Sequence, residues 1–234
     1  MLEDILRSGF AELSLPLDGQ ALARYRLYAD RLEETNKVMN LTAIEGEDEV
    51  ARLHFLDSAA LLTLTDFSAK RVIDVGTGAG FPGLALKIAQ PDLSAVLLDS
   101  LDKRVGFLRE TVEALGLDGV SYIHARAEEA PPAWRGSFDI AVSRAVARLN
   151  VLSELCLPLL KKGGLFIAMK GTEHSEELRE AKNAIRVLGG EIEAERDYAI
   201  PGTEVVHSAI LIRKVADTPP KYPRRWAQIK KQAL

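Results

Sequence analysis

From Lys70 onward, short apolar runs alternate with longer stretches whose apolar residues keep helical spacing. The apolar runs predict strands at 71–75, 94–99, 119–124, 138–143 and 164–169, and the intervening stretches predict helices at about 82–90, 101–115, 149–160 and 174–188. Alternation of this kind is typical of an α/β fold, with a mainly parallel sheet and helices on both faces. The last extended runs, 191–199 and 205–213, have no helix between them, so they predict a hairpin with one antiparallel strand.

The N-terminal third of the chain lacks this strand pattern. Apolar residues keep helical spacing from Leu2 to Phe10 and from Leu22 to Leu32, and a third helix is expected at 48–64. We therefore expect three parts, which are a helical subdomain at 1–66, a domain with a mostly parallel seven-stranded sheet at 67–213, and a basic tail at 214–234.

A glycine-rich turn follows the first predicted strand. Three glycines at alternate positions, Gly76, Gly78 and Gly80, come directly after that strand and are followed by Pro82. Glycine accepts positive φ and lets a ligand approach the backbone closely. Proline suits the first position of a helix, where its missing N–H would lack a partner anyway. Strand, turn and helix together predict a cradle for a cofactor.

Two cofactor classes compete for this turn, and a turn without any ligand is a third interpretation. Gly78, Gly80 and Gly83 have the GxGxxG spacing of dinucleotide-binding folds. Asp74 favours a cationic cofactor such as S-adenosylmethionine, because a bound pyrophosphate gains nothing from a nearby anion. The pattern apolar-Asp-x-Gly-x-Gly-x-Gly resembles motif I of the Rossmann-like methyltransferases. Asp99, followed by Ser100, ends the second strand and can accept hydrogen bonds from ribose hydroxyls, which both cofactors have.

Polar residues also follow the later strands, where ligands of doubly wound sheets bind. Ala127-Glu128 is the candidate for contact with an adenine edge, through a backbone N–H or a carboxylate. Arg144 and Lys170 end neighbouring strands, which is an awkward place for an unpaired charge. They could neutralise buried acids (Asp74, Asp139 or Glu128 are the candidates), or they could meet a cofactor carboxylate or an RNA phosphate.

Several kinds of chemistry find no support in the sequence. Cys156 is the single cysteine and sits in an apolar stretch, so we expect it to be buried rather than catalytic. No Asn-Pro-Pro-Tyr motif of amino-group methyltransferases and no clustered metal-binding pattern occurs. Three histidines, His124, His174 and His207, are expected to be structural or exposed. No apolar run approaches the roughly 20 residues that span a bilayer, and no signal peptide is evident, so we expect a cytoplasmic protein.

Charge is distributed unevenly along the chain. The net charge is −4, yet residues 213–234 carry seven basic residues and one acidic residue. This basic segment contains Tyr222 and Trp226, and it could bind phosphates and stack on bases. It could equally be a solubilising terminus that its two aromatic residues pack onto the domain. If it binds RNA, deletion of residues 214–234 should weaken RNA binding and leave cofactor binding intact.

Together these motifs resemble one family over nearly the whole chain, the bacterial 16S ribosomal RNA guanine-N7 methyltransferases, also called the glucose-inhibited division protein B family. The resemblance depends on eight motifs in order: Asn40-Leu41-Thr42, His54-Phe55-Leu56-Asp57-Ser58, Asp74 to Gly83, Leu98-Asp99-Ser100 with Lys103-Arg104, Arg126-Ala127-Glu128, Ser143-Arg144-Ala145, Met169-Lys170-Gly171 and Tyr222-Pro223-Arg224.

The resemblance implies a Rossmann-like methyltransferase fold, S-adenosylmethionine as cofactor, and N7 of guanosine 527 in 16S rRNA as the methyl acceptor, close to the decoding site. The partner would be this RNA in the small ribosomal subunit or its precursor, and the enzyme would act as a monomer. Cofactor contacts would come from Asp74, Gly76, Gly78, Gly80, Phe81, Asp99, Ser100, Ala127, Glu128 and Arg144. Residues around the RNA-facing mouth would be His54, Asp57, Ser58, Lys170, Tyr222, Arg224 and Arg225.

Guanine N7 carries a lone pair and no proton, so its methylation needs alignment with the methyl donor rather than a general base. Arg144 and Lys170 are the candidates for positioning the guanine. Two alternatives stay open, a ribosome-associated RNA-binding module with a vestigial cofactor pocket and a nicotinamide-dependent dehydrogenase.

Overall fold

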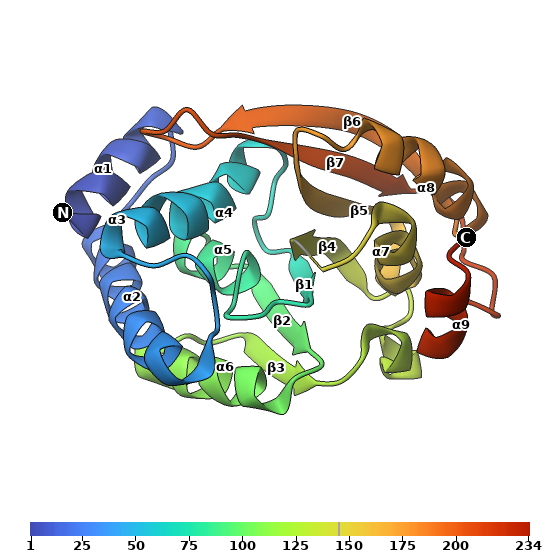
Figure 1. The fold of residues 1–234 in the computed structure, drawn as a ribbon, viewed down its shortest axis with the longest axis horizontal. Helices are drawn as coiled ribbons and strands as arrows, with labels where there is room; N and C mark the ends of the chain where they lie inside the picture. Colours follow the sequence, from blue (N-terminus) through green and yellow to red (C-terminus); the bar gives the residue numbers. More distant parts are fainter. Residues whose placement is uncertain (145) are drawn as a thin grey trace.

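The protein is built around one seven-stranded sheet, seen in a computed structural model that describes residues 1–144 and 146–234. The strands lie in the order β3-β2-β1-β4-β5-β7-β6 (Figure 1). Their bounds are β1 (Arg71–Val75), β2 (Ser94–Asp99), β3 (Val120–His124), β4 (Phe138–Arg144), β5 (Leu160–Gly171), β6 (Gly190–Ala199) and β7 (Val206–Lys214). The first five strands pair in parallel, whereas β7 is antiparallel to both β5 and β6. The predicted α/β sheet with a final hairpin is therefore confirmed.

The helices follow the predicted order. They are α1 (Leu2–Glu12), α2 (Gly19–Met39), α3 (Glu47–Glu49), α4 (Asp57–Ala60), α5 (Gly83–Ala89), α6 (Asp102–Leu115), α7 (Leu149–Cys156), α8 (Ser175–Val187) and α9 (Trp226–Lys231). The Asp18 side chain accepts the N–H of Ala21 at the start of α2, and Asn40 ends this helix in the left-handed conformation. Both ends of the longest helix are thus set by local residues.

Some predicted boundaries are wrong, and the reasons are local. The helix expected at 48–64 is divided, because a π-helical segment (Val50–Leu56) separates α3 from α4. Pro82 precedes α5 rather than opening it, and Gly83 is the first helical residue. The helix expected at 149–160 ends at Cys156, and a short 3-10 turn containing Pro158 leads directly into β5 at Leu160, four residues earlier than expected.

Two apolar clusters cover the two faces of the sheet. One contains side chains of α1, α2, α4, α5 and α6 and of the sheet residues that face them, such as Val72, Leu97 and Leu211. The other contains side chains of α7, α8 and α9 and of the opposite sheet face, such as Ile73, Phe166 and Ile212. Figure 1 shows the two groups of helices on opposite sides of the molecule, with the N-terminus and the C-terminus at opposite ends.

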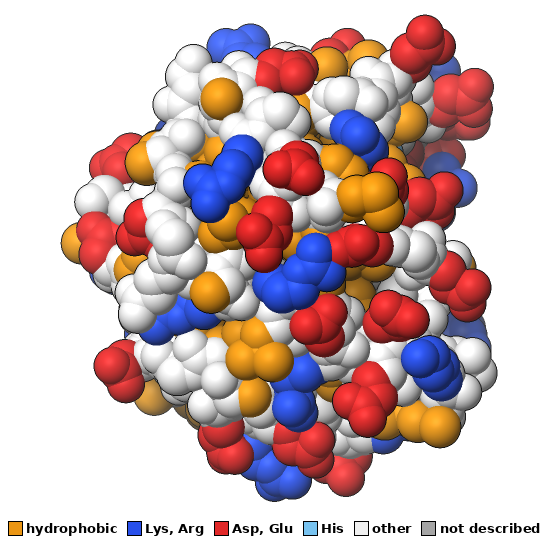
Figure 2. All heavy atoms as spheres, turned by 90° about the vertical axis from the view of Figure 1, so that its left-hand side faces the viewer, with side chains coloured by type: hydrophobic (Ala, Val, Ile, Leu, Met, Phe, Trp, Pro, Cys, Tyr) orange, Lys and Arg blue, Asp and Glu red, His pale blue; other side chains and the backbone are white. Residues whose placement is uncertain are grey.

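The N-terminal helices belong to the first of these clusters, because Tyr25 and Phe55 are fully buried in it. Figure 2 shows acidic and basic side chains interspersed over their outer face. Within the part of the chain that the structure describes, we find no helix that combines the length and the apolar character needed to cross a membrane.

Gly83 packs too closely against β1 and β2 to accept a side chain without displacement of its neighbours. A Cβ there would lie 2.7 Å from Leu97 Cδ2 and 2.8 Å from the Asp74 side chain, whereas a Cβ at Gly106, inside α6, meets nothing within 4 Å. Gly83→Ala should lower the free energy of unfolding by about 1–3 kcal/mol through overpacking. Gly106→Ala, the matched control, should raise it by about 0.5–1 kcal/mol. Urea unfolding of the two variants measures this, and equal effects would contradict the packing argument.

Candidate active site

A cavity of about 460 Å³ opens at the carboxyl ends of the parallel strands. It spans the point where the strand order reverses between β1 and β4, which is where doubly wound sheets bind ligands. Its size is typical of small-molecule sites. Eight of the ten predicted cofactor residues line it: Gly76, Gly78, Phe81, Asp99, Ser100, Ala127, Glu128 and Arg144.

The glycine turn forms the floor of this cavity. The N–H groups of Gly76 and Thr77 donate to the carbonyl of Leu98 at 2.8 and 3.1 Å, which ties the turn to β2. Gly78 has a φ of 61°, and a Cβ built on it would meet nothing within 4 Å. The open space above Gly78 is therefore free for a ligand that touches the backbone.

Asp74 lies beneath the turn rather than in the cavity wall. Its Oδ2 accepts hydrogen bonds from the Thr77 hydroxyl and from the Gly83 N–H, both at 2.7 Å. Its Oδ1 is buried and has no hydrogen-bond partner among the described residues. Burial raises the pKa of this carboxyl to about 6, although Thr77 and Gly83 oppose the rise. Asp74 therefore fixes the shape of the turn, and Gly80 likewise lies outside the cavity lining.

Asp99 connects the turn to the start of α6. Its Oδ2 accepts the Gly78 N–H at 2.9 Å and lies 3.5 Å from the Arg104 guanidinium. Its Oδ1 accepts the N–H of Leu101 at 2.9 Å. Each carboxylate oxygen has two lone pairs, so Asp99 keeps acceptor capacity toward the cavity that it lines.

Glu128 provides a second acceptor at the far end of the cavity. It follows β3 next to Ala127, and its Oε1 is buried without a partner among the residues that the structure describes. Burial raises the pKa of this carboxyl. A buried, unpaired acceptor costs free energy, so Glu128 is suited to a ligand that brings a hydrogen-bond donor.

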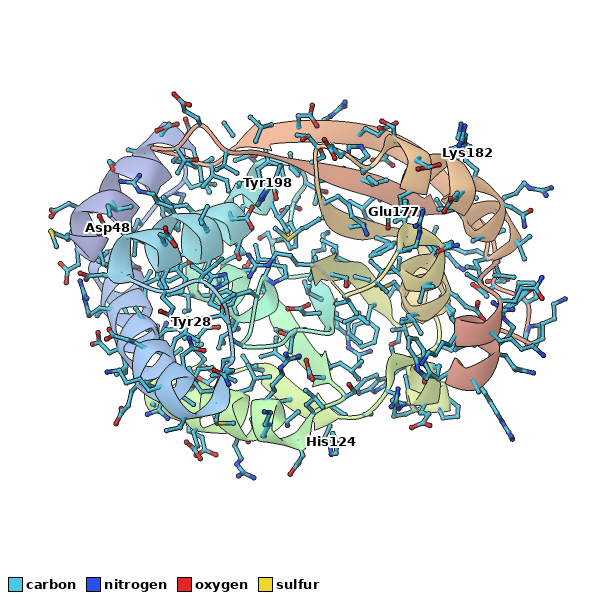
Figure 3. The ribbon with its side chains drawn as sticks, in the orientation of Figure 1. Tyr28, Asp48, His124, Glu177, Lys182 and Tyr198 are labelled. Carbon is cyan, nitrogen blue, oxygen red and sulfur yellow. The ribbon has the colours of Figure 1, made fainter. Side chains whose placement is uncertain are left out.

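An aromatic stack joins the N-terminal helices to the glycine turn. The Phe81 ring lies between Tyr28 and His54, with ring centroids 5.2 and 4.1 Å away and nearly parallel planes. The Tyr28 hydroxyl, on the inner side of α2, also donates to the carbonyl of Ala79 (Figure 3). The predicted helical subdomain thus packs directly against the cofactor loop.

Arg144 is held by the same N-terminal residues. Its Nη1 donates to the carbonyl of Leu53 at 3.0 Å and to Asp57 Oδ2 at 2.9 Å, and its Nη2 donates to His54 Nδ1 at 2.7 Å. The acid that pairs with Arg144 is therefore Asp57, and not Asp74, Asp139 or Glu128 as the sequence suggested.

His54 is an uncharged bridge between Arg144 and Thr42. Its Nδ1 accepts from the guanidinium, so Nε2 carries the proton and donates to Thr42 Oγ1, 2.9 Å away. Burial, together with the nearby charge of Arg144, lowers the pKa of His54 to about 3. The neighbouring Ser58 is fully buried, and its hydroxyl donates to the carbonyl of His54.

A second cavity, of about 550 Å³, lies on the other side of the Arg144–His54 pair and shares both residues with the first. Met169, Val205 and His207 contribute to its wall. His207 was expected to be structural or exposed. Its side chain is partly exposed, and its Nδ1 donates to Asp57 Oδ1 at 2.8 Å. Asp57 is fully buried and accepts from Tyr198 as well.

Asp57 and the charged groups around it change one another's pKa values. Burial alone would raise the pKa of Asp57, but the hydrogen bond from His207 and the charge of Arg144 lower it. The same hydrogen bond raises the pKa of His207. His207 and Asp57 are 150 positions apart, and sequence spacing gives no sign of their pairing.

Lys170 lines the second cavity together with Arg144, but the two side chains leave the sheet on opposite faces. Arg144 pairs with Met169 in the sheet register, so Lys170, one position later, leaves the sheet on the opposite face. Its Nζ donates to Glu177 at 2.6 Å, on α8 (Figure 3), and to the carbonyl of Ala147 at 2.9 Å. Lys170 therefore has an acid partner that the sequence reading did not name.

The predicted RNA-facing residues of the C-terminal segment differ in exposure. Tyr222 is buried in the second apolar cluster. Arg224 forms an ion pair with the buried Glu154, with its Nη2 2.6 Å from Oε2. Arg225 is exposed, as are Lys230 and Lys231 in α9.

The expectation for the single cysteine is confirmed by the structure. Cys156 is buried, and burial raises the pKa of its thiol, as the sequence predicted for a packing residue. Among the described residues, no group of three or more His, Cys, Asp or Glu side chains is arranged to hold a metal ion.

The pairing of His207 with Asp57 predicts a pH-dependent stability. A histidine whose pKa is raised on folding stabilises the protein fully below its unfolded pKa of about 6.5, and this stabilisation is lost as the pH rises through the folded pKa. His207→Gln keeps a neutral hydrogen-bond donor, so it should cost about 1 kcal/mol at pH 6 and less at pH 9. Denaturant unfolding at the two pH values measures this. His124→Gln, remote from Asp57, is the control, and a cost independent of pH would contradict the ion pair.

Comparison with known proteins places the chain in a family. Residues 21–197 match the family described as rRNA small subunit methyltransferase G. A ribosomal RNA small subunit methyltransferase G from Alkaliphilus metalliredigens is 46% identical over 224 residues, which cover 94% of each chain. The protein of the same name from Acetivibrio thermocellus is 44% identical over 235 residues, which cover 100% of this chain and 97% of the relative.

Solved structures with lower identity agree in fold. TrmN from Thermus thermophilus is 24% identical with a TM-score of 0.53, over 68% of this chain and 48% of that chain. TYW2 from M. jannaschii, crystallised in complex with AdoMet, is 12% identical with a TM-score of 0.55, over 68% of this chain and 75% of that chain. The predicted Rossmann-like methyltransferase fold is thus confirmed, and family membership confirms the predicted cofactor, S-adenosylmethionine. The chain belongs to the rRNA small subunit methyltransferase G family.

Proposed function

We propose that the protein transfers a methyl group from S-adenosylmethionine to N7 of guanosine 527 in 16S rRNA. The observation that carries this proposal is the pair of cavities that meet at Arg144 and His54. One has the features of a nucleoside-cofactor site. The other is an adjoining space, lined by apolar and cationic side chains, in which an extruded base would fit.

The first cavity fits S-adenosylmethionine on three grounds. The open space above Gly78 admits a ligand against the backbone. Asp99 has acceptor capacity for ribose hydroxyls, and the unpaired Oε1 of Glu128 suits the exocyclic amine of adenine. When bound there, S-adenosylmethionine supplies an electrophilic methyl group on a sulfonium. Gly76 and Phe81, near Arg144, would then border its amino-acid end.

The second cavity would hold the guanine. Arg144 uses both Nη1 hydrogens and one Nη2 hydrogen on Leu53, Asp57 and His54, which leaves Nε–H and one Nη2–H as donors. A guanidinium donates readily to guanine O6, the neighbour of N7. Arg144 would thereby orient the ring so that N7 faces the first cavity, and Phe81 and His54 would exclude water from the boundary.

No general base is required for this reaction, because N7 has a lone pair and no proton to remove. Asp57 accepts hydrogen bonds from Arg144, His207 and Tyr198, so its role is to hold these side chains in place. Catalysis then rests on alignment of the methyl donor and the acceptor.

The substrate is inferred from the family. The relatives named above are ribosomal RNA small subunit methyltransferases, and we extend that substrate to this chain. Exposed cations of the C-terminal segment, Lys221, Arg225, Lys230 and Lys231, are suited to phosphate contacts. A ribosome-associated module with a vestigial pocket is less well supported, because such a pocket would be filled by side chains, whereas this cavity is open.

Asp99→Ala should raise the Kd for S-adenosylmethionine by about 10- to 100-fold, as expected for losing hydrogen bonds to a charged acceptor. Asp102→Ala is the matched control, since Asp102 lies three positions away and its side chain is exposed. Isothermal calorimetry on the two variants measures the effect. Equal affinities of the two variants for S-adenosylmethionine would show that Asp99 does not contribute to cofactor binding.

The proposed reaction makes 7-methylguanosine at one position of 16S rRNA. Purified protein with labelled S-adenosylmethionine should methylate RNA or small subunits from cells that lack the gene, and mass mapping should place the label on N7 of guanosine 527. RNA from cells that have the gene should accept no further label there. A label on another base, or on an exocyclic amine, would contradict the proposed acceptor.

A further inference from the structure

The C-terminal segment reaches into the wall of the first cavity. Trp226, the first residue of α9, lines that cavity together with Arg126, Ala127, Glu128 and Leu155. Its ring lies 5.8 Å from the Arg126 guanidinium carbon, and it packs against the second apolar cluster. Figure 1 shows α9 beside α7, far from the N-terminal helices that border the other end of the site.

Buried polar contacts hold this segment in place. Arg224 donates from Nε and Nη2 to Glu154, a residue of α7 that is 1% exposed, and its backbone N–H donates to Glu154 Oε1 as well. Arg135 Nη1 donates to the carbonyl of Tyr222 at 2.7 Å. Ile229 of α9 is buried. Glu154 is followed directly by Leu155, so the helix that anchors the segment also lines the cavity.

We propose that Trp226 is a cofactor-binding residue that contacts the adenine end of S-adenosylmethionine, so that the C-terminal segment forms part of the cofactor site. The inference rests on the cofactor placement given under the proposed function. Within the cavity, Trp226 shares the wall with Glu128, whose unpaired Oε1 suits an exocyclic amine. An aromatic side chain beside that acceptor supplies apolar contact area for the purine ring.

This role changes what the basic segment is expected to do. Sequence alone suggested that deletion of residues 214–234 would weaken RNA binding and leave cofactor binding intact. If Trp226 contacts the adenine, the same deletion weakens cofactor binding too. RNA that engages the exposed Arg225, next to Trp226, would then act on the cofactor site through this contact.

The two tryptophans of the chain, Trp134 and Trp226, make the proposal directly measurable. The probe is S-adenosylhomocysteine, titrated into the full-length protein and followed by intrinsic fluorescence and by calorimetry. In Trp134→Phe, the emission of the remaining Trp226 should change as ligand is added, and the Kd obtained from this change should equal that of the unchanged protein. In Trp226→Phe, saturating ligand should leave the Trp134 emission as it was, because Trp134 packs against Phe138 and does not line the cavity.

Affinity provides the second readout. Trp226→Ala should raise the Kd for S-adenosylhomocysteine about tenfold, corresponding to loss of one aromatic contact with a base. Trp226→Phe should stay within about threefold of the unchanged protein, and Trp134→Phe should bind equally well. The same ratios should hold for 5′-methylthioadenosine, which keeps the adenine and lacks the amino-acid end.

Two results would overturn the inference. One is a Trp226→Ala variant that binds both ligands as tightly as the unchanged protein, and the other is a Trp134→Phe variant whose fluorescence does not respond to saturating ligand. The fluorescence experiment needs no change at Trp226, so it decides the question even if Trp226→Ala fails to fold. If the unchanged protein bound neither ligand, the proposed cofactor placement itself would be wrong, and this outcome is distinct from the other two.

Discussion

The site depends first on one buried carboxylate. Asp74 lies at the end of β1, and its Oδ2 accepts from the Thr77 hydroxyl and the Gly83 N–H, so one atom joins the strand, the glycine turn and the start of α5. A buried carboxylate is costly unless it is hydrogen-bonded, and here Thr77 of the turn and Gly83 at the start of α5 donate to Oδ2, while Oδ1 has no partner among the described residues. These two hydrogen bonds hold the turn in the conformation in which Gly78 faces the cavity. In this way the strand end determines the shape of the cofactor cradle.

The second constraint comes from the N-terminal helices, which complete the site rather than merely cover the sheet. Phe81 is stacked between Tyr28 and His54, and Arg144 is held by Leu53, His54 and Asp57. A methyltransferase domain without these residues would leave Arg144 unpaired at a strand end, where an uncompensated charge is expensive. In the divided helix at 47–63, the backbone carbonyl of Leu53 and the side chains of His54 and Asp57 all accept hydrogen bonds from the Arg144 guanidinium.

The sequence was most informative where a single local pattern determines the structure. Short apolar runs located the strands, and the glycine turn with Asp99 located the cofactor cavity, since both depend on neighbours along the chain. Contacts set by strand register were not predictable in the same way. The pairing of Arg144 with Met169 puts Lys170 on the other face of the sheet, and a register offset by one residue would have placed it beside Arg144. The partner of Arg144, Asp57, is 87 positions away, and the His207–Asp57 pair and the Arg224–Glu154 pair also link residues distant in the chain.

These long-range pairs bear on the chemistry. Asp57 is the carboxylate that lines the second cavity, yet it accepts hydrogen bonds from Arg144, His207 and Tyr198. Burial would raise its pKa, but the hydrogen bond from His207 and the charge of Arg144 lower it. A carboxylate stabilised in this way is a poor proton acceptor, because taking a proton would forfeit those interactions. An acceptor atom that must lose a proton would therefore find little help here. In the proposed reaction guanine N7 has no proton to lose. The network that makes Asp57 a poor base would then hold Arg144 in place against the ring, and alignment would be the main contribution of the protein.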